Sequence, residues 1–378
     1  MLPSFRPSVD RRFDAFVADV REFVELESPT TDKAACDRAG RHFAERFREY
    51  AGAEIVWHGQ ERQGDHFEAR VGRGARKILL LGHFDTVWPA GTIGRLPCRI
   101  ERDRLTGPGS FDMKCGDIQA LWALRLLTEA GAGTDKTFTF LANSDEEIGS
   151  PTSRPIIERL ARDSECVFVL EPAVGAEGAI KLWRKGIGMY TLEVDGVASH
   201  AGADPEKGRS AVLELAHQVI DLHNLNNAAL GTTVNIGVVH GGTRRNVVAA
   251  HAEAEIDLRV RTADEARRAD EAIRNRPAFV SGTTARIRGG LNRPPMEETE
   301  ASRRLYALAR RIAADEGFDL PAGGTGGGSD GNFTAALGVP TLDGLGAVGD
   351  GGHAEHEHVV VSTMAPRLAW FTRLLAEV

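Results

Sequence analysis

Three apolar runs and one Gly-rich turn between residues 78 and 171 are each followed by an acid or a histidine. The runs are ILLLG, TFTFLA and VFVL, and the turn is GPGS. Short apolar runs separated by helical patterns predict parallel strands of an α/β sheet. Polar groups in such sheets gather at the carboxyl ends of the strands. One imidazole and several carboxylates at that edge indicate a metal site, and these residues are His83, Asp85, Asp112, Glu146, Glu147 and Glu171.

Length and composition limit the class of protein. A chain of 378 residues is long enough for about two domains. The net charge of -8, without a basic stripe, argues against a nucleic-acid binder. The four cysteines have no CxxC spacing, which fits a reducing compartment and argues against a thiolate zinc site. No apolar run nears the ~20 residues of a membrane span, and residues 1–14 lack the apolar core of a secretion signal. We therefore expect a cytoplasmic protein.

The sequence pattern changes after residue 183 and changes back near residue 293. Residues 1–183 and 293–378 alternate helical and strand patterns, which predicts an α/β domain with a mostly parallel central sheet. Residues 184–292 follow a βαββαβ pattern, and residues 250–260 alternate strictly between apolar and polar side chains. This pattern predicts an inserted α+β domain of the ferredoxin-like kind.

Each candidate metal ligand also has a simpler interpretation. The HxD pair at His83 and Asp85 is compatible with a hydrogen-bonded strand end. Asp112 precedes a predicted helix and is a suitable N-cap. Glu146 and Glu147 fit a solvated loop, although carboxylates crowded at a buried sheet edge repel one another unless a cation or protons compensate. A carboxylate as deep as Glu171 needs a partner.

An ordered series of motifs identifies the chain by resemblance. It is similar to the dinuclear-zinc metallopeptidase family of carboxypeptidase G, succinyl-diaminopimelate desuccinylase, acetylornithine deacetylase, aminoacylase and peptidase T. The similarity covers nearly the whole chain and is greatest to the glutamate carboxypeptidase branch. The motifs are LLLGHFDTV, GPGSFDMKCG, SDEEIGS, EPA, GVASHAGADPEKGRSA, NVVAAHAEAEIDLRV, GGGSD and the final His-rich loop.

The resemblance implies a centre of two Zn²⁺ ions, for which Co²⁺ or Mn²⁺ are possible substitutes. By this resemblance Asp85 orients His83, and Glu146 is the general base. The last loop has three histidines in six residues, so His356 is an alternative to His353 as the late ligand. The implied metal ligands are His83 and Glu171 for one ion, Glu147 and His353 for the other, and Asp112 as the bridge.

The resemblance also assigns roles in substrate binding. His200 would act in catalysis: it would reach the active site of the other subunit of a homodimer and stabilise the tetrahedral oxyanion there. The inserted domain would serve as lid and dimerisation platform. The alternative for His200 is a strand-end histidine tied to Ser199, and the alternative for Arg259 is a salt bridge with Glu253 or Asp257. The implied substrate contacts are Arg259, Asn246, Gly326, Gly327, Gly328 and Ser329.

These observations predict a zinc-dependent carboxypeptidase or amidohydrolase. It would hydrolyse an amide bond next to a free carboxylate and release a C-terminal glutamate, or a similar amino acid, from a small peptide or an N-acyl or folate-like substrate. An N-acyl-amino-acid deacylase is the alternative with the same ligands. A metal-free binding relative would need a broken ligand set, and a dehydrogenase would need a strand–GxGxxG–helix fingerprint that the sequence lacks.

Overall fold

The computed structural model describes residues 4–378, which separate into two compact units. The first unit comprises the chain up to Trp183 together with Glu298–Thr325 and Ser329–Val378, and the second comprises Arg184–Glu297 with Gly326–Gly328. The second unit thus extends to Glu297, five residues beyond the predicted end of the insert at residue 292. The predicted lack of a secretion signal concerns residues 1–14, of which residues 1–3 lie outside the described part.

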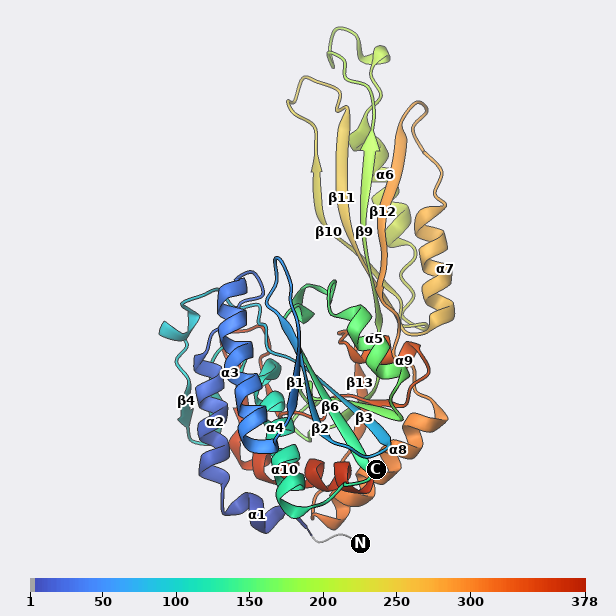
Figure 1. The fold of residues 1–378 in the computed structure, drawn as a ribbon. Coiled ribbons are helices and arrows are strands. Elements are labelled where there is room, and N and C mark those ends of the chain that lie inside the picture. Colours follow the sequence, from blue (N-terminus) through green and yellow to red (C-terminus); the bar gives the residue numbers. More distant parts are fainter. Residues whose placement is uncertain (1–3) are drawn as a thin grey trace. The chain divides into compact units, whose positions relative to one another are not determined.

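A six-stranded sheet forms the centre of the first unit (Figure 1). Its strand order is β1-β2-β6-β3-β7-β14. Strands β6, β3, β7 and β14 run parallel, whereas β2 is antiparallel to both of its neighbours. The prediction of a mostly parallel central sheet is therefore confirmed. The strands are β1 (Glu54–His58), β2 (His66–Gly72), β3 (Arg76–His83), β6 (Lys136–Asn143), β7 (Cys166–Val169) and β14 (Thr341–Leu342).

Helices cover both faces of this sheet, so the first unit has three layers. Ile78 and Leu80 of β3 join a core with α2, α3, α4, α8 and α10, while Leu79 and Leu81 pack with α5 and α9. This alternation explains why a central strand reads as a continuous apolar run. The helices are α1 (Arg6–Asp10), α2 (Phe13–Glu25), α3 (Lys33–Ala51), α4 (Cys115–Ala130), α5 (Arg154–Arg162), α8 (Glu300–Asp315), α9 (Gly331–Ala336) and α10 (Val361–Glu377). No helix within residues 4–378 combines the length and apolar character that a membrane crossing requires.

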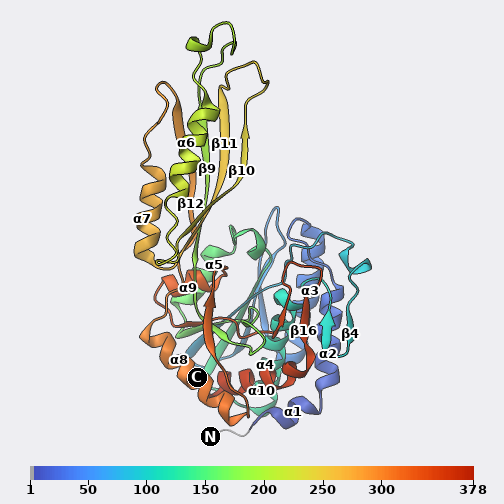
Figure 2. The same ribbon diagram turned by 180° about the vertical axis from the view of Figure 1, so that it is seen from behind.

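Two small sheets complete the first unit, and one of them anchors the late His-rich loop. Figure 2 shows β16 and β4 in this small sheet, whose order is β15-β16-β5-β4. His358 pairs with Thr106 and Val359 with Leu105, which fixes the C-terminal end of the loop. The strands are β4 (Arg99–Glu101), β5 (Arg104–Thr106), β15 (Gly349–Asp350) and β16 (His358–Val360), and the other small sheet joins β8 (Ile180–Arg184) to β13 (Ala322–Thr325).

The second unit has the predicted βαββαβ order. Its four antiparallel strands have the order β10-β11-β9-β12, and α6 and α7 pack on the buried side chains of one face. Alternate residues of β11, such as Ala254, Ile256 and Leu258, are buried, as the sequence predicted. The ferredoxin-like prediction is confirmed. The elements are β9 (Gly186–Asp195), α6 (Ala211–His223), β10 (Thr233–Gly241), β11 (His251–Val260), α7 (Ala263–Arg274) and β12 (Thr284–Arg293).

Candidate metal centre

Five predicted ligands converge into two groups that share Asp112. The first group is His83, Asp112 and Glu171, and the second is Asp112, Glu147 and His353, with the ligand atoms of each group within 4.8 Å of one another. His83 Nε2 lies 3.3 Å from Asp112 Oδ1 and 3.6 Å from Glu171 Oε1. His353 Nε2 lies 3.3 Å from Asp112 Oδ2 and 3.1 Å from Glu147 Oε2. Asp112 thus presents one carboxylate oxygen to each group, as a bridging ligand would.

The parallel sheet explains why residues distant in sequence meet here. His83 is the last residue of β3, Glu146 and Glu147 lie in a short 3-10 helix after β6, and Glu171 follows β7. Because these three strands are parallel neighbours, their carboxyl ends lie at one edge of the sheet. Asp112 reaches the same edge from the turn that precedes α4. The topology therefore brings four of the five ligands together, and His353 is supplied by the loop between β15 and β16.

Asp85 connects the first metal group to the segment that carries Glu146. Its carboxylate is fully buried and accepts the main-chain N–H groups of Glu146 and Glu147, each at 3.3 Å, and the Thr30 hydroxyl at 2.7 Å. His83 Nδ1 lies 3.1 Å from the Asp85 main-chain oxygen and 3.5 Å from its Oδ1. A proton on Nδ1 directed at Asp85 leaves Nε2 as the metal-facing nitrogen.

The charges and unpaired atoms of the centre fit divalent cations. Asp112 Oδ1 and Glu147 Oε1 are buried and have no hydrogen-bond partner among the described residues. Burial raises the pKa of Glu147 to about 7. Hydrogen bonds to Asp112 and Glu147 raise the pKa of His353 to about 11. The site therefore attracts positive charge, and its imidazole and carboxylate donors are the ligand types of zinc.

The geometry distinguishes between alternatives that the sequence left open for Asp112 and for the late histidine. Asp112 does not cap α4, because the helix begins after Lys114 without a side-chain hydrogen bond at its N-cap. His356 belongs to neither metal group and instead lines a surface hollow with Arg104 and His358. The geometry thus favours His353 over His356 as the late ligand.

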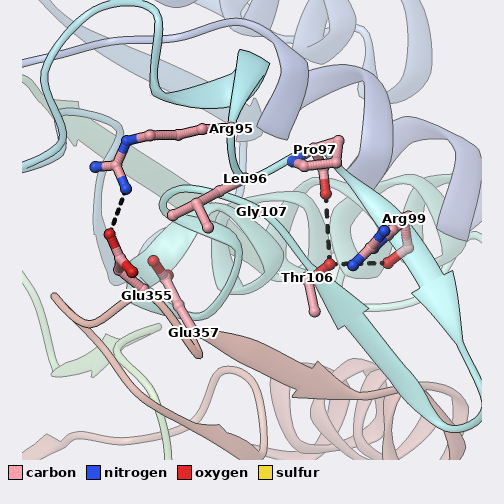
Figure 3. A pocket seen from close by; sticks show the side chains of 8 residues that line it. All are labelled: Arg95, Leu96, Pro97, Arg99, Thr106, Gly107, Glu355 and Glu357. Atoms are coloured by element: carbon pink, nitrogen blue, oxygen red, sulfur yellow. Dashed lines mark hydrogen bonds and ion pairs between the residues drawn. The ribbon is translucent and has the colours of Figure 1, made fainter.

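The sequence did not single out Glu357, which holds the Asp112 turn in place. Glu357 is only 3% exposed and accepts the main-chain N–H groups of Gly109, Phe111 and Asp112 at 3.0, 2.9 and 3.1 Å. It also accepts Trp88 Nε1–H at 2.8 Å. In Figure 3 it lies beside Glu355, whose carboxylate pairs with Arg95. One side chain thus joins the Asp112 turn to the loop of His353. Its position directly before an apolar strand was the available signal.

A second set of hydrogen bonds, which the sequence did not predict, holds the segment of Glu146 and Glu147 in place. Asp145 accepts the N–H groups of Thr152 and Ser153 and both of their hydroxyls, at 2.6–3.2 Å. Asp330, in the GGGSD motif, accepts hydrogen bonds from Asn143 and Ser150. These contacts bend the segment back on itself, so the two glutamates keep their positions after β6.

His66 adds a pH-sensitive contact to the same segment. Its Nδ1 accepts the Ser144 N–H at 3.2 Å, and its Nε2 lies 2.9 Å from Thr152 Oγ1. Burial lowers the pKa of His66 below the ordinary value of 6.5. Below pH 6.5 the unfolded chain therefore binds a proton that the folded chain does not, and stability is lost as the pH falls towards the folded-state pKa.

We expect the His66→Gln variant to lose this component of the acid dependence. Between pH 6.5 and the folded-state pKa, the wild type should lose up to about 1.4 kcal/mol per pH unit through His66. Urea unfolding with chelator present, at a series of pH values, measures the difference between wild type and variant. Equal slopes for the two proteins would contradict the assignment.

The residues predicted to act on or contact the substrate include His200 and Asn246 of the second unit. His200 is exposed, and its Nδ1 accepts the N–H groups of Gly202 and Ala203 at 3.2 and 3.0 Å. Its role across a dimer stays a prediction, as does that of Asn246, whose main-chain oxygen accepts the Ala201 N–H at 3.0 Å. Because Nδ1 of His200 accepts two hydrogen bonds, a neutral imidazole there carries its proton on Nε2.

Arg259 has the salt bridge that the sequence offered as its alternative role. Its Nε lies 2.8 Å from Asp257 Oδ1 and its second guanidinium nitrogen 2.9 Å from Oδ2. The third nitrogen donates to the Gly326 carbonyl at 3.4 Å, so Arg259 does contact the predicted Gly-rich loop, which continues through Gly327 and Gly328. Ser329 ends that loop inside the first unit: it is fully buried and donates to Asp343 at 2.5 Å.

Comparison with known proteins places this geometry in a family. The chain is 31% identical to carboxypeptidase G2 of Pseudomonas sp. (strain RS-16) over 319 residues, 83% of this chain and 77% of that protein. It is 26% identical to succinyl-diaminopimelate desuccinylase of Stenotrophomonas maltophilia (strain R551-3), over 94% of this chain and 96% of that one. The fold matches the YXEP protein of Bacillus subtilis, described as a dinuclear metal binding peptidase from the M20 family, with a TM-score of 0.69, 16% identity and coverage of 97% and 98%. Residues 79–377 match Peptidase family M20/M25/M40, and the chain belongs to that family of metallopeptidases.

Proposed function

We propose that the protein is a dinuclear zinc hydrolase that cleaves an amide bond next to a free carboxylate. The pair of ligand groups that share Asp112 is the observation that carries this proposal. The similarity to carboxypeptidase G2 supports release of a C-terminal glutamate or a similar amino acid from a peptide or an N-acyl or folate-like substrate.

The residues of the centre have two roles: five are the proposed metal ligands, and one is the proposed general base. His83, Asp112 and Glu171 would hold one ion, and Asp112, Glu147 and His353 the other. Bound zinc would polarise the scissile carbonyl and lower the pKa of water. Glu146 lines a hollow with His83 and Glu171, but it belongs to neither ligand group. It is the proposed base that takes a proton from the attacking water and gives it to the leaving amine.

Arg259 is the proposed reader of the substrate carboxylate. Its bidentate contact with Asp257 shows that the planar guanidinium faces a carboxylate in a two-pronged geometry. A substrate carboxylate would have to compete with Asp257 for the same nitrogens. This competition favours substrates whose carboxylate is fixed by a second contact, for which the Gly326–Gly328 segment is the proposed source.

Metal removal tests the proposal directly. Dialysis against a chelator should abolish amide hydrolysis, and two equivalents of Zn²⁺ per chain should restore it, because the residues alone supply no electrophile. Activity that is unchanged by both treatments would exclude the proposal. A panel of γ-glutamyl, folate-like and N-acyl amino acids, assayed with the restored protein, identifies the substrate class.

An N-acyl-amino-acid deacylase is the second candidate. The similarity to succinyl-diaminopimelate desuccinylase over nearly the full length of both chains favours it. The ligand groups serve either reaction, since both cleave an amide bond. Faster hydrolysis of N-acyl amino acids than of C-terminal glutamate substrates, at equal concentration in the same panel, would establish this candidate in place of the first.

A further inference from the structure

A buried lysine contacts the side chain of one of the proposed metal ligands, Glu171. Lys181, in β8, has only 8% of its side chain exposed, and its Nζ lies 3.8 Å from Glu171 Oε2. The other oxygen of that carboxylate, Oε1, faces His83 at 3.6 Å. The two carboxylate oxygens of Glu171 therefore face different groups: Oε1 faces His83 of the metal group, and Oε2 faces Lys181.

The position of Lys181 is fixed from its other side by Asp343. The Asp343 side chain is fully buried, and its Oδ1 lies 4.0 Å from Lys181 Nζ. The two residues also exchange main-chain hydrogen bonds, from Lys181 N–H at 2.7 Å and from Asp343 N–H at 3.2 Å. Asp343 Oδ2 accepts the Ser329 hydroxyl at 2.5 Å. Lys181 is thus held between two carboxylates by contacts at both its ends.

The second metal group has no equivalent cation. Within residues 4–378, the ion pairs of Asp112 and Glu147 are with His83 and His353, and neither carboxylate pairs with a lysine or an arginine. A lysine ammonium repels a bound metal ion, and burial strengthens this repulsion because water screens it less. The two groups therefore differ in that only the first has an ammonium beside one of its carboxylates, although both contain one histidine and two carboxylates.

We propose that Lys181 is a positioning residue that makes the two metal positions unequal. It keeps Glu171 as a ligand through one oxygen and weakens the binding of the ion at His83, Asp112 and Glu171. The ion at Asp112, Glu147 and His353 is held more tightly and is the last to leave. This inference rests on the proposed dinuclear centre.

Stepwise metal release from the loaded protein tests the inference. The loaded protein is equilibrated with increasing concentrations of a chromophoric chelator, and the zinc that remains is counted by elemental analysis. We expect two release steps in the wild type. The Lys181→Met substitution should tighten the weaker step on the order of tenfold, because it removes a positive charge without shortening the side chain much. Lys181→Arg should keep the wild-type affinities within a few-fold.

Two further variants separate a charge effect from a structural one. Lys77→Met makes the same change in net charge at an exposed position of β3, where Lys77 pairs with Asp163 at the surface, and it should leave both release steps unchanged. Asp343→Asn removes the carboxylate that balances Lys181, so it should loosen the weaker step. The same substitution made together with Lys181→Met should have little effect on that step.

The signs of these changes decide the result. A residue with a merely structural role would loosen metal binding when replaced, so unchanged or weaker binding in Lys181→Met would overturn the inference. If that variant does not fold, Lys181→Gln, which also removes the positive charge, takes its place: a tightened weaker step supports the inference, and unchanged or weaker binding overturns it. A wild type that binds no divalent metal would instead contradict the dinuclear centre itself, which distinguishes the two failures.

Discussion

Replacing Glu146 with glutamine is expected to lower turnover by about 10²–10⁴-fold while both metal ions stay bound. Glutamine has nearly the same shape as glutamate but cannot take a proton at neutral pH. Glu146 belongs to neither ligand group, and its main-chain N–H, at 3.3 Å from Asp85 Oδ1, is unaffected by the substitution. Turnover and metal content, measured on the same preparation, check both parts of the expectation.

The neighbouring glutamate supplies the matched control. Glu147→Gln makes the same chemical change one residue away, but Glu147 is in the group with Asp112 and His353. We expect this control to lose metal as well as activity, and added zinc to restore part of the activity. If Glu146→Gln kept turnover within a few-fold of the wild type, Glu146 would not be the base. If it lost metal like the control, it would be a ligand.

The sequence was most informative where a local pattern determines position. An apolar run long enough for one strand, such as that before His83, fixes the strand, and parallel pairing brings its end to the shared edge. The ligand groups at His83, Glu147 and Glu171 follow from this rule. Asp112 needed the family resemblance, because its local pattern alone favours a helix cap over a metal ligand. The helix in fact begins after Lys114 without such a cap.

The supporting residues were not predictable because their partners lie far away in the chain. Glu357 bonds with residues about 250 positions earlier, and Lys181 faces Asp343 across the fold. The sequence places Glu357 next to an apolar strand, but it does not show which distant groups will cover its carboxylate in the folded chain. The same limit applies to Ser329, which reads as part of an exposed Gly-rich loop but lies buried against Asp343.

Glu357→Gln is expected to destabilise the fold by roughly 3–5 kcal/mol. The carboxylate accepts two N–H groups at each oxygen: those of Phe111 and Asp112 at Oε1, and those of Trp88 and Gly109 at Oε2. A glutamine has one acceptor oxygen, so two buried donors would lose their acceptor and would face the amide NH₂ instead. Urea unfolding of metal-free protein measures this cost without a contribution from metal binding.

Glu355→Gln is the matched control, because Glu355 differs from Glu357 chiefly in being exposed to solvent. It lies two residues earlier in the same loop, its side chain is 72% exposed, and its ion pair with Arg95 is at the surface. Glu355→Gln makes the same change in charge, and we expect it to cost less than about 1 kcal/mol. The Glu357 variant should also bind zinc about 10–100-fold more weakly, as replacement of groups that orient ligands usually does. The reason is that at least one of the three main-chain N–H groups of the Asp112 turn loses its acceptor. Equal unfolding free energies for the two variants would show that the four hydrogen bonds of Glu357 contribute nothing, and the Asp112 turn would then need another support.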